Sequence, residues 1–283
     1  MALQISHHVG SSLNTFLMLL EHRPAVLVQV CSSQGSVPRG VGTWMAVFAQ
    51  SLVGTVGGGH LEHVAIANAR AFLVDPSAGV LETKKRFALG PALGQCCGGV
   101  VHLHFESVSS ADAACLEKRL RPKLWPMALF GGGHVGQALV VVLSTLPVSL
   151  RWIDSRDGVF PHDVPTAVIC EQSDPPHAAV HDLEPQSLVL IMSFSHAEDL
   201  DIVAACLLRQ RERGDLPFIG LIGSKTKWAT FRNRLAARGF TEAELAHVTC
   251  PIGIAGITRK EPEMIAVSVA AQVLQLLEEK DRL

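Results

Sequence analysis

From residue 125 onward, apolar runs alternate with helical patterns, and this alternation constrains the fold more than any other feature of the 283-residue sequence. Strands that alternate with helices through short connections favour a parallel sheet with helices on both faces. We therefore predict a doubly wound α/β domain over residues 125–283. The predicted strands cover 126–130, 148–153, 167–170, 188–193 and 218–222, and the predicted helices cover 134–145, 197–213, 225–238 and 262–279.

A glycine-rich turn follows the first of these strands. Gly131, Gly133 and Gly136 have the spacing G-x-G-x-x-G and open the next helix. Glycine permits a tight turn and lets the backbone approach a phosphate, while the helix N-terminus offers unpaired amides. We expect a side chain at Gly133 to intrude on the turn. Asp154 ends the next strand, about twenty residues on, where an acid would contact ribose hydroxyls.

This combination predicts a Rossmann-like domain, but it leaves the ligand open. Arg156 lies close enough to Asp154 in the chain to meet an extra phosphate in place of a ribose. The alternatives are a nicotinamide dinucleotide, another phosphorylated ligand, or no ligand, in which case the glycines serve strand–helix packing.

Two more turns follow strands at the predicted carboxyl edge of the sheet, where open α/β sheets bind ligands. One contains His196, beside Ser195 and Glu198, which fit the capping-box pattern of a helix start. The other contains Lys225 and Lys227. For both lysines an anionic ligand and plain solvent remain alternatives.

The first part of the chain contains a second glycine turn, Gly57-Gly58-Gly59, followed by His60 and Glu62. Such a turn before a helix can receive an anion. Glu62 either complements the helix dipole or holds a ligand amine or a neighbouring histidine.

Strands and helices predicted around this turn form an α+β domain over residues 1–108, joined by a linker over 109–124 to the second domain. The predicted helices cover 12–22 and about 60–72, and the predicted strands cover 25–31, 44–48, 51–56, 81–87 and 100–106.

Adjacent cysteines, Cys96 and Cys97, stand between glycines in an uncharged stretch. Neighbouring cysteines without a second pair do not supply a structural zinc site. The flanking glycines let a ligand approach both thiols, and sulfur suits a soft metal or a sulfur-bearing cofactor. The alternative is that these residues are small buried hydrophobes.

Composition excludes several classes of protein. A net charge of −2 and a pI near 6.7 indicate no binding of nucleic acid or of an anionic membrane surface. No apolar run reaches about 18 residues, so we expect no membrane span. Seven irregularly spaced cysteines behind a polar N-terminus predict reduced thiols in the cytoplasm. Motifs of hydrolytic centres are absent from the sequence, and we assign no catalytic residue.

Six motifs, in order along nearly the whole chain, resemble those of the XdhC/CoxI family of xanthine dehydrogenase accessory proteins. They are Gln34–Gly40, Gly57–Glu62, Leu93–Gly99, Phe130–Gly136, Leu221–Lys225 and Pro251–Gly253. The resemblance implies an N-terminal family domain, a C-terminal Rossmann-like domain and a homodimer. It also implies a chaperone that binds molybdenum cofactor, protects it during sulfuration and inserts it into apo xanthine dehydrogenase, with a cysteine desulfurase as sulfur donor.

Many members of this family have a cysteine where this chain has His60, which puts more weight on Cys96 and Cys97 as metal ligands. The residues that we expect to bind the cofactor are Cys96, Cys97, Gly57, Gly58, Gly59, His60, Glu62, Gly131, Gly133, Gly136, Asp154, Arg156, His196 and Lys225.

Two alternative functions remain: an NAD(P)-dependent oxidoreductase and a nucleotide-sensing regulatory protein. Tyrosine is absent and no histidine is clearly paired with an acid, so the oxidoreductase lacks an obvious proton relay.

Overall fold

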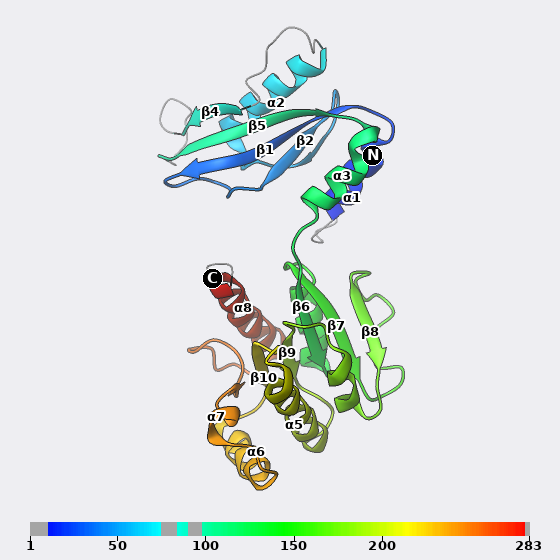
Figure 1. Ribbon diagram of the computed structural model, residues 1–283, viewed down its shortest axis with the longest axis vertical. Coiled ribbons are helices and arrows are strands. Elements are labelled where there is room, and N and C mark those ends of the chain that lie inside the picture. The colour runs from blue at the N-terminus through cyan, green and yellow to red at the C-terminus, as the bar shows by residue number, and fades with distance from the viewer. Residues whose placement is uncertain (1–10, 75–83, 90–97, 281–283) are drawn as a thin grey trace. The chain divides into compact units, whose positions relative to one another are not determined.

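A computed structural model describes residues 11–74, 84–89 and 98–280 of the chain. The chain divides into two compact units, and the boundary along the chain falls between Pro122 and Lys123 (Figure 1). We expected a linker over 109–124. In the structure these residues contain a short 3-10 helix, Ser110–Asp112, and α3, Ala113–Leu120, both within the first unit.

The first unit is built on a five-stranded antiparallel sheet in the order β3-β2-β1-β5-β4. Its central pair, β1 and β5, runs in register from Ala25 opposite Val108 to Gln34 opposite Val100, with a shift between Val30 and Ser32. The strands are β1 Ala25–Gln34, β2 Trp44–Val47, β3 Leu52–Gly54, β4 Lys84–Ala88 and β5 Val100–Val108.

Helices cover the two faces of this sheet unequally (Figure 1). Helix α2, Gly59–Val74, buries Leu61 and Ala65 against the valines and leucines of one face. Helix α1, Ser11–Leu20, and α3 pack on the other face, where Phe16 joins a cluster at one end of the strands. On β4 and β5 that second face includes the polar side chains of Lys84, Arg86, His102 and His104.

The second unit is built on a six-stranded parallel sheet in the order β11-β10-β9-β6-β7-β8. This is the order of a dinucleotide-binding fold, in which the chain direction across the sheet reverses between β6 and β9. The predicted α/β class with a Rossmann-like second domain is confirmed. The strands are β6 Trp125–Phe130, β7 Val148–Asp154, β8 Val168–Gln172, β9 Leu188–Ile191, β10 Phe218–Leu221 and β11 Val248–Thr249.

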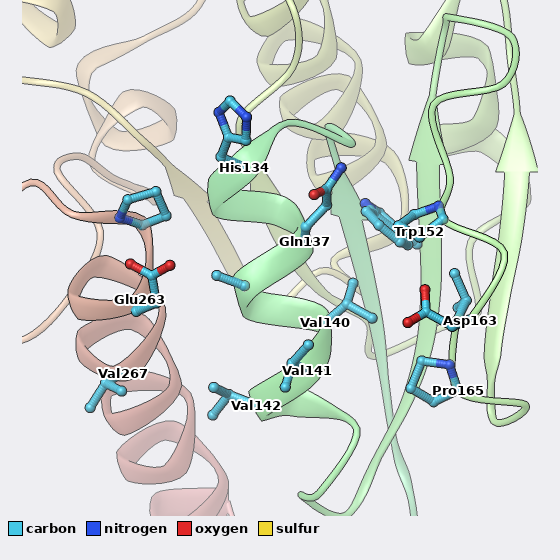
Figure 2. Close-up of a pocket in the computed structure, with 14 residues that line it drawn as sticks. His134, Gln137, Val140, Val141, Val142, Trp152, Asp163, Pro165, Glu263 and Val267 are labelled. Carbon is cyan, nitrogen blue, oxygen red and sulfur yellow. The ribbon is translucent and has the colours of Figure 1, made fainter.

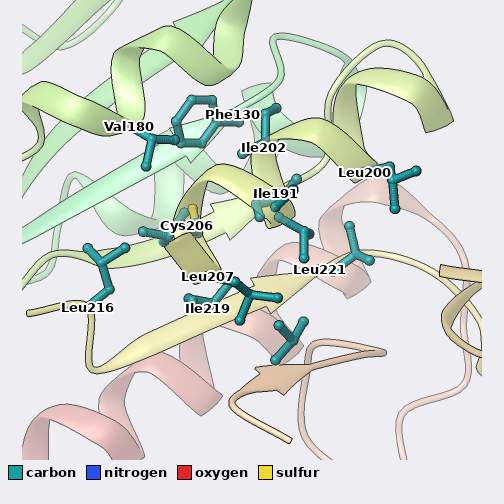
Figure 3. Close-up of a cluster of buried hydrophobic side chains, with 14 of the residues drawn as sticks. Phe130, Val180, Ile191, Leu200, Ile202, Cys206, Leu207, Leu216, Ile219 and Leu221 are labelled. Atoms are coloured by element: carbon teal, nitrogen blue, oxygen red, sulfur yellow. The ribbon is translucent and has the colours of Figure 1, made fainter. Parts of the chain in front are cut away.

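Both faces of this sheet are covered. Helices α4, His134–Leu143, and α8, Pro262–Lys280, bury Leu139 and Val269 on one face. Helix α5, His196–Arg213, covers the opposite face, where Ile202 and Leu207 pack on β9 and β10 (Figure 3). Two further helices follow, α6 Lys225–Ala237 and α7 Glu242–Leu245.

The sequence did not predict β11, α7 or a 3-10 helix at Pro176–Asp182. The first two are only two and four residues long, too short to show a period. Among the described residues, no helix is long and apolar enough to cross a membrane.

Candidate functional site

Three glycine-containing motifs meet at one end of the first sheet. The loop after β1 begins at Gly35, the turn after β3 contains Gly57, and Gly99 immediately precedes β5. A Cβ atom at Gly99 would lie 2.4 Å from the carbonyl oxygen of Ser36, and one at Gly57 would lie 2.6 Å from Cγ of Pro38. Glycine is therefore required at both positions, because Gly99 packs against the backbone of the loop after β1 and Gly57 packs against the ring of Pro38 in the same loop.

Glu62 closes the turn in front of α2. Its Oε2 accepts the N–H of Val56 at 3.1 Å, the N–H of Gly58 at 3.2 Å and the hydroxyl of Thr55. Thr55 Oγ1 in turn accepts the N–H of Gly57 at 3.1 Å. Glu62 therefore stabilises the turn. The N–H groups of Val56, Gly57 and Gly58, which could have bound an anion, already have acceptors within the protein.

The other metal and cofactor candidates of this domain are less defined. His60 and His63 are exposed on the first turns of α2, with ring centroids 6.4 Å apart. Cys96 and Cys97 lie outside the described residues, and Gly98, the next residue, is exposed. Residues 11–74, 84–89 and 98–280 contain no group of three His, Cys, Asp or Glu side chains suited to a metal ion.

The glycine turn after β6 has the geometry of a phosphate-binding turn. Gly131 has φ +118°, and a Cβ atom there would lie 2.0 Å from the carbonyl oxygen of Met192. A Cβ atom at Gly136 would lie 2.1 Å from the carbonyl oxygen of Gly131. At Gly133 a Cβ atom would meet nothing within 4 Å, so our expectation that a side chain intrudes there is wrong. Gly133 instead leaves open space at the N-terminus of α4.

Asp154 turns toward the glycine turn rather than outward. Its Oδ2 accepts the N–H of Gly132 at 2.6 Å and Nη2–H of Arg156 at 2.8 Å. Its Oδ1 accepts the backbone N–H and Nε–H of Arg156, both at 2.9 Å. Burial raises the pKa of Asp154, but the hydrogen bonds from Arg156 and Gly132 outweigh it and leave the pKa below its ordinary value. Both oxygens that would accept ribose hydroxyls are thus engaged.

Arg156 also joins two loops across the end of β6. Its guanidinium lies 4.7 Å from the ring centroid of Phe194, which follows β9 and is 68% exposed. Ser155 Oγ donates to Glu198 Oε1 at 2.8 Å, which links the loop after β7 to the first turn of α5. Since β6 lies between β7 and β9, these contacts bridge the place where a dinucleotide crosses such a sheet.

Two helix caps define the neighbouring turns. Ser195 Oγ accepts the N–H of Glu198 at 3.2 Å, which confirms Ser195 as the N-cap of α5. The predicted capping box is only half formed, because the Glu198 carboxylate accepts from Ser155 instead. Ser224 caps α6 by accepting the N–H of Lys227. His196 and Lys225 are the first residues of these helices, and both are exposed.

A buried ion pair at this edge was missed by sequence reasoning. Lys227 Nζ lies 2.6 Å from Asp199 Oδ2 and donates to the carbonyl oxygen of Ile222 at 2.9 Å. Asp199 Oδ1 accepts the N–H of Ser193 at 2.8 Å. Cys250 lies beside the pair, and burial raises its pKa to about 11. The sequence did offer a signal for this pair, because Asp199 and Lys227 lie in the first turns of the successive helices α5 and α6.

A cavity of about 550 Å³ lies over the outer face of α4, between the loop after β7 and the start of α8 (Figure 2). Its walls are mainly valines and prolines. Its polar groups are His134, Gln137, Asp163 and Glu263. Gln137 donates to the carbonyl oxygen of Gly132 at 3.2 Å, so the cavity borders the glycine turn.

The fold and the glycine turn define a two-domain protein with a Rossmann domain at its C-terminal side. Residues 127–273 match the XdhC Rossmann domain, and residues 18–83 match the XdhC and CoxI family. The chain therefore belongs to the XdhC and CoxI family, which confirms the resemblance seen in its motifs.

Two comparisons place the chain among known proteins. The uncharacterized protein YqeB of Escherichia coli K12 is 28% identical over 257 residues, which cover 89% of this chain and 43% of YqeB. The chain thus spans less than half the length of that relative. A crystal structure from Bacillus halodurans, described as a xanthine dehydrogenase, has a TM-score of 0.74 at 19% identity and covers 95% of this chain and 96% of that one. At that identity the likeness shows the fold alone.

Proposed function

We propose that this protein is a chaperone for molybdenum cofactor, which it protects during sulfuration and inserts into apo xanthine dehydrogenase. Membership of the XdhC family points to a role in xanthine dehydrogenase maturation, and that membership carries the proposal. A cysteine desulfurase would supply the sulfur, and the working form would be a homodimer.

The convergence of the family motifs in the first domain supports this proposal. The loop that begins at Gly35 contacts both the turn that contains Gly57 and the segment at Gly99, although the three are far apart in the sequence. The cofactor is a pterin with a phosphate tail and a dithiolene that binds molybdenum, so a carrier needs soft donors near the metal and an anion-binding site for the phosphate. Cys96 and Cys97 immediately precede Gly98 and would hold or shield the molybdenum end.

The oxidoreductase alternative loses its main support. It depended on a free acid after β7, yet both carboxylate oxygens of Asp154 already accept hydrogen bonds from Arg156 and Gly132.

A carrier must also release its cargo, so we expect it to bind the cofactor with a dissociation constant on the order of 1 μM, about −8 kcal/mol, rather than with nanomolar affinity.

The test is analysis of molybdenum and pterin in protein purified from cells that make the cofactor, followed by transfer to apo xanthine dehydrogenase. We expect cofactor on the wild type and activation of the apoenzyme. Cys96→Ala and Cys97→Ala should lower retention without unfolding the protein. Cys115→Ala is the matched control, since Cys115 is an exposed thiol on α3.

Three outcomes would count against the proposal. A wild type that carries no cofactor and activates no apoenzyme would refute the chaperone function. Full loading of both cysteine variants would make Cys96 and Cys97 structural. Binding of NADP with turnover of a substrate would favour the oxidoreductase instead.

A further inference from the structure

Basic side chains pair across the last two strands of the first sheet. In the register of β4 and β5, Lys84 lies opposite His104 and Arg86 lies opposite His102. Residues directly opposite each other in an antiparallel pair point to the same face. We call these four residues the basic strip.

The basic strip lies on the polar part of the face that α1 and α3 share. Lys85, one position along β4, points to the opposite face, where its Nζ donates to Asn68 of α2 at 3.0 Å. Lys84 and Arg86 are exposed, and His102 and His104 are half-buried. Figure 1 shows α2 along one face of the sheet and α1 with α3 at one end of the other.

This arrangement concentrates positive charge. Lys84 and Arg86 lie two residues apart on the same face of β4, so their charges repel each other at short range, and a bound anion would relieve that repulsion. The acid on the same face of β5, Glu106, is held by Arg119 of α3 and does not neutralise the strip. Lysine on an edge strand such as β4 also discourages edge-to-edge pairing, but that role requires no basic partner on the inner strand β5.

The side chains suit a phosphate group. The guanidinium of Arg86 presents a planar fork of N–H donors, and the ammonium of Lys84 adds a point charge. Ser32 Oγ lies 3.0 Å from Nδ1 of His102, which fixes the ring. Strands rise about 3.3 Å per residue, so His102 stands about 10 Å along β5 from Gly99, where the glycine loops meet.

We propose that the basic strip binds the phosphate tail of the cargo, an inference that rests on the proposed function. The turn before α2 has few free amides for this anion, because Glu62 and Thr55 already accept from Val56, Gly57 and Gly58. The strip supplies the cationic donors that this turn lacks.

The first test uses inorganic pyrophosphate, titrated into the full chain by calorimetry. We expect saturable binding that weakens at least tenfold in the double variant Lys84→Gln, Arg86→Gln and weakens with rising salt. Lys85→Gln is the matched control, because it removes a charge from the same strand on the other face, and it should bind within about twofold of wild type. Equal binding by wild type and the double variant would overturn the proposal.

The second test measures cofactor retained by the same variants after purification from cofactor-producing cells. Loss in the double variant but not in Lys85→Gln, and displacement of cofactor by pyrophosphate, would support the proposal. Unchanged retention in the double variant would overturn it. If wild type carries no cofactor, the chaperone function fails, and the pyrophosphate titration still decides whether the strip is an anion site with another ligand.

Discussion

Asp154 Oδ2 accepts the backbone N–H of Gly132 at 2.6 Å, which ties the end of β7 to the turn that follows β6. The carboxylate is only 1% exposed and also receives hydrogen bonds from Arg156. Asp154, which the sequence predicts to bind a ligand, therefore stabilises the glycine turn instead. Its loss should affect the stability of the domain before it affects binding.

Replacement of Asp154 by asparagine should lower the free energy of unfolding of the second domain by about 2–3 kcal/mol, since it leaves Arg156 without its carboxylate. The partial exposure of Arg156, 36% of its side chain, keeps the loss below that of a fully buried pair. Urea unfolding followed by tryptophan fluorescence measures the change. Asp201→Asn, which breaks the exposed pair with Arg238, should cost less than about 0.5 kcal/mol. Equal effects of the two variants would contradict this role.

The same interactions predict how stability depends on pH. Hydrogen bonds from Arg209 lower the pKa of Asp215, and those from Arg156 and Gly132 leave the pKa of Asp154 lowered despite burial. A carboxyl whose pKa is lower in the folded state contributes stability above its unfolded pKa of about 4, and this is lost as pH falls through the folded pKa. The free energy of unfolding should therefore decrease from about pH 5 to pH 3, and less steeply in Asp154→Asn. An unchanged slope in that variant would oppose this assignment.

The sequence predicted the second domain well because its strands are buried on both faces. All four residues of β9 are buried, and so are those of β10, so each strand appears as a continuous apolar run. The direction of the Asp154 side chain was not predictable in this way. It depends on the Arg156 side chain, which donates to Asp154 from two residues further along the chain, and on the N–H of Gly132, which lies in the turn after the neighbouring strand β6.

The first domain shows the same limit. Its glycines could be identified in the sequence, but the contact of Gly99 with Ser36 depends on the pairing of β1 with β5. Arg86 and His102 likewise become neighbours only through the register of β4 and β5. Local patterns predict elements, whereas these relationships arise from pairing between segments distant in the chain.

The glycines of the turn after β6 should differ sharply in their tolerance of alanine. Gly131→Ala should cost more than about 3 kcal/mol or prevent folding of the second domain, because Cβ would meet the carbonyl oxygen of Met192 in a left-handed conformation. Gly133→Ala should change the free energy of unfolding by less than about 1 kcal/mol, because open space surrounds that position. Thermal unfolding of both variants measures the difference. A strongly destabilised Gly133→Ala would show that this turn is packed differently.

Glu62 should be required for the turn before α2. Glu62→Ala leaves the amides of Val56 and Gly58 without their acceptor, and we expect a loss of about 2 kcal/mol in the first domain. His60→Ala is the control, because His60 is exposed on the same turn of the helix and should cost less than about 0.5 kcal/mol. Hydrogen exchange of the amides at positions 56–58 measures the loss directly. Protection that persists in Glu62→Ala would exclude this function of the carboxylate.

Thiol labelling should separate structural cysteines from those available to a cargo. Burial raises the pKa of Cys206 to about 12, so its thiol stays protonated near pH 8 and should label only when the protein unfolds. Cys115 is exposed and should label first, and the raised pKa of Cys250 should delay its labelling. Peptide mass spectrometry after timed exposure to iodoacetamide measures this order, with urea-unfolded protein as the control in which all thiols react. Rapid labelling of Cys206 in the folded protein would show that α5 opens far more readily than its burial predicts.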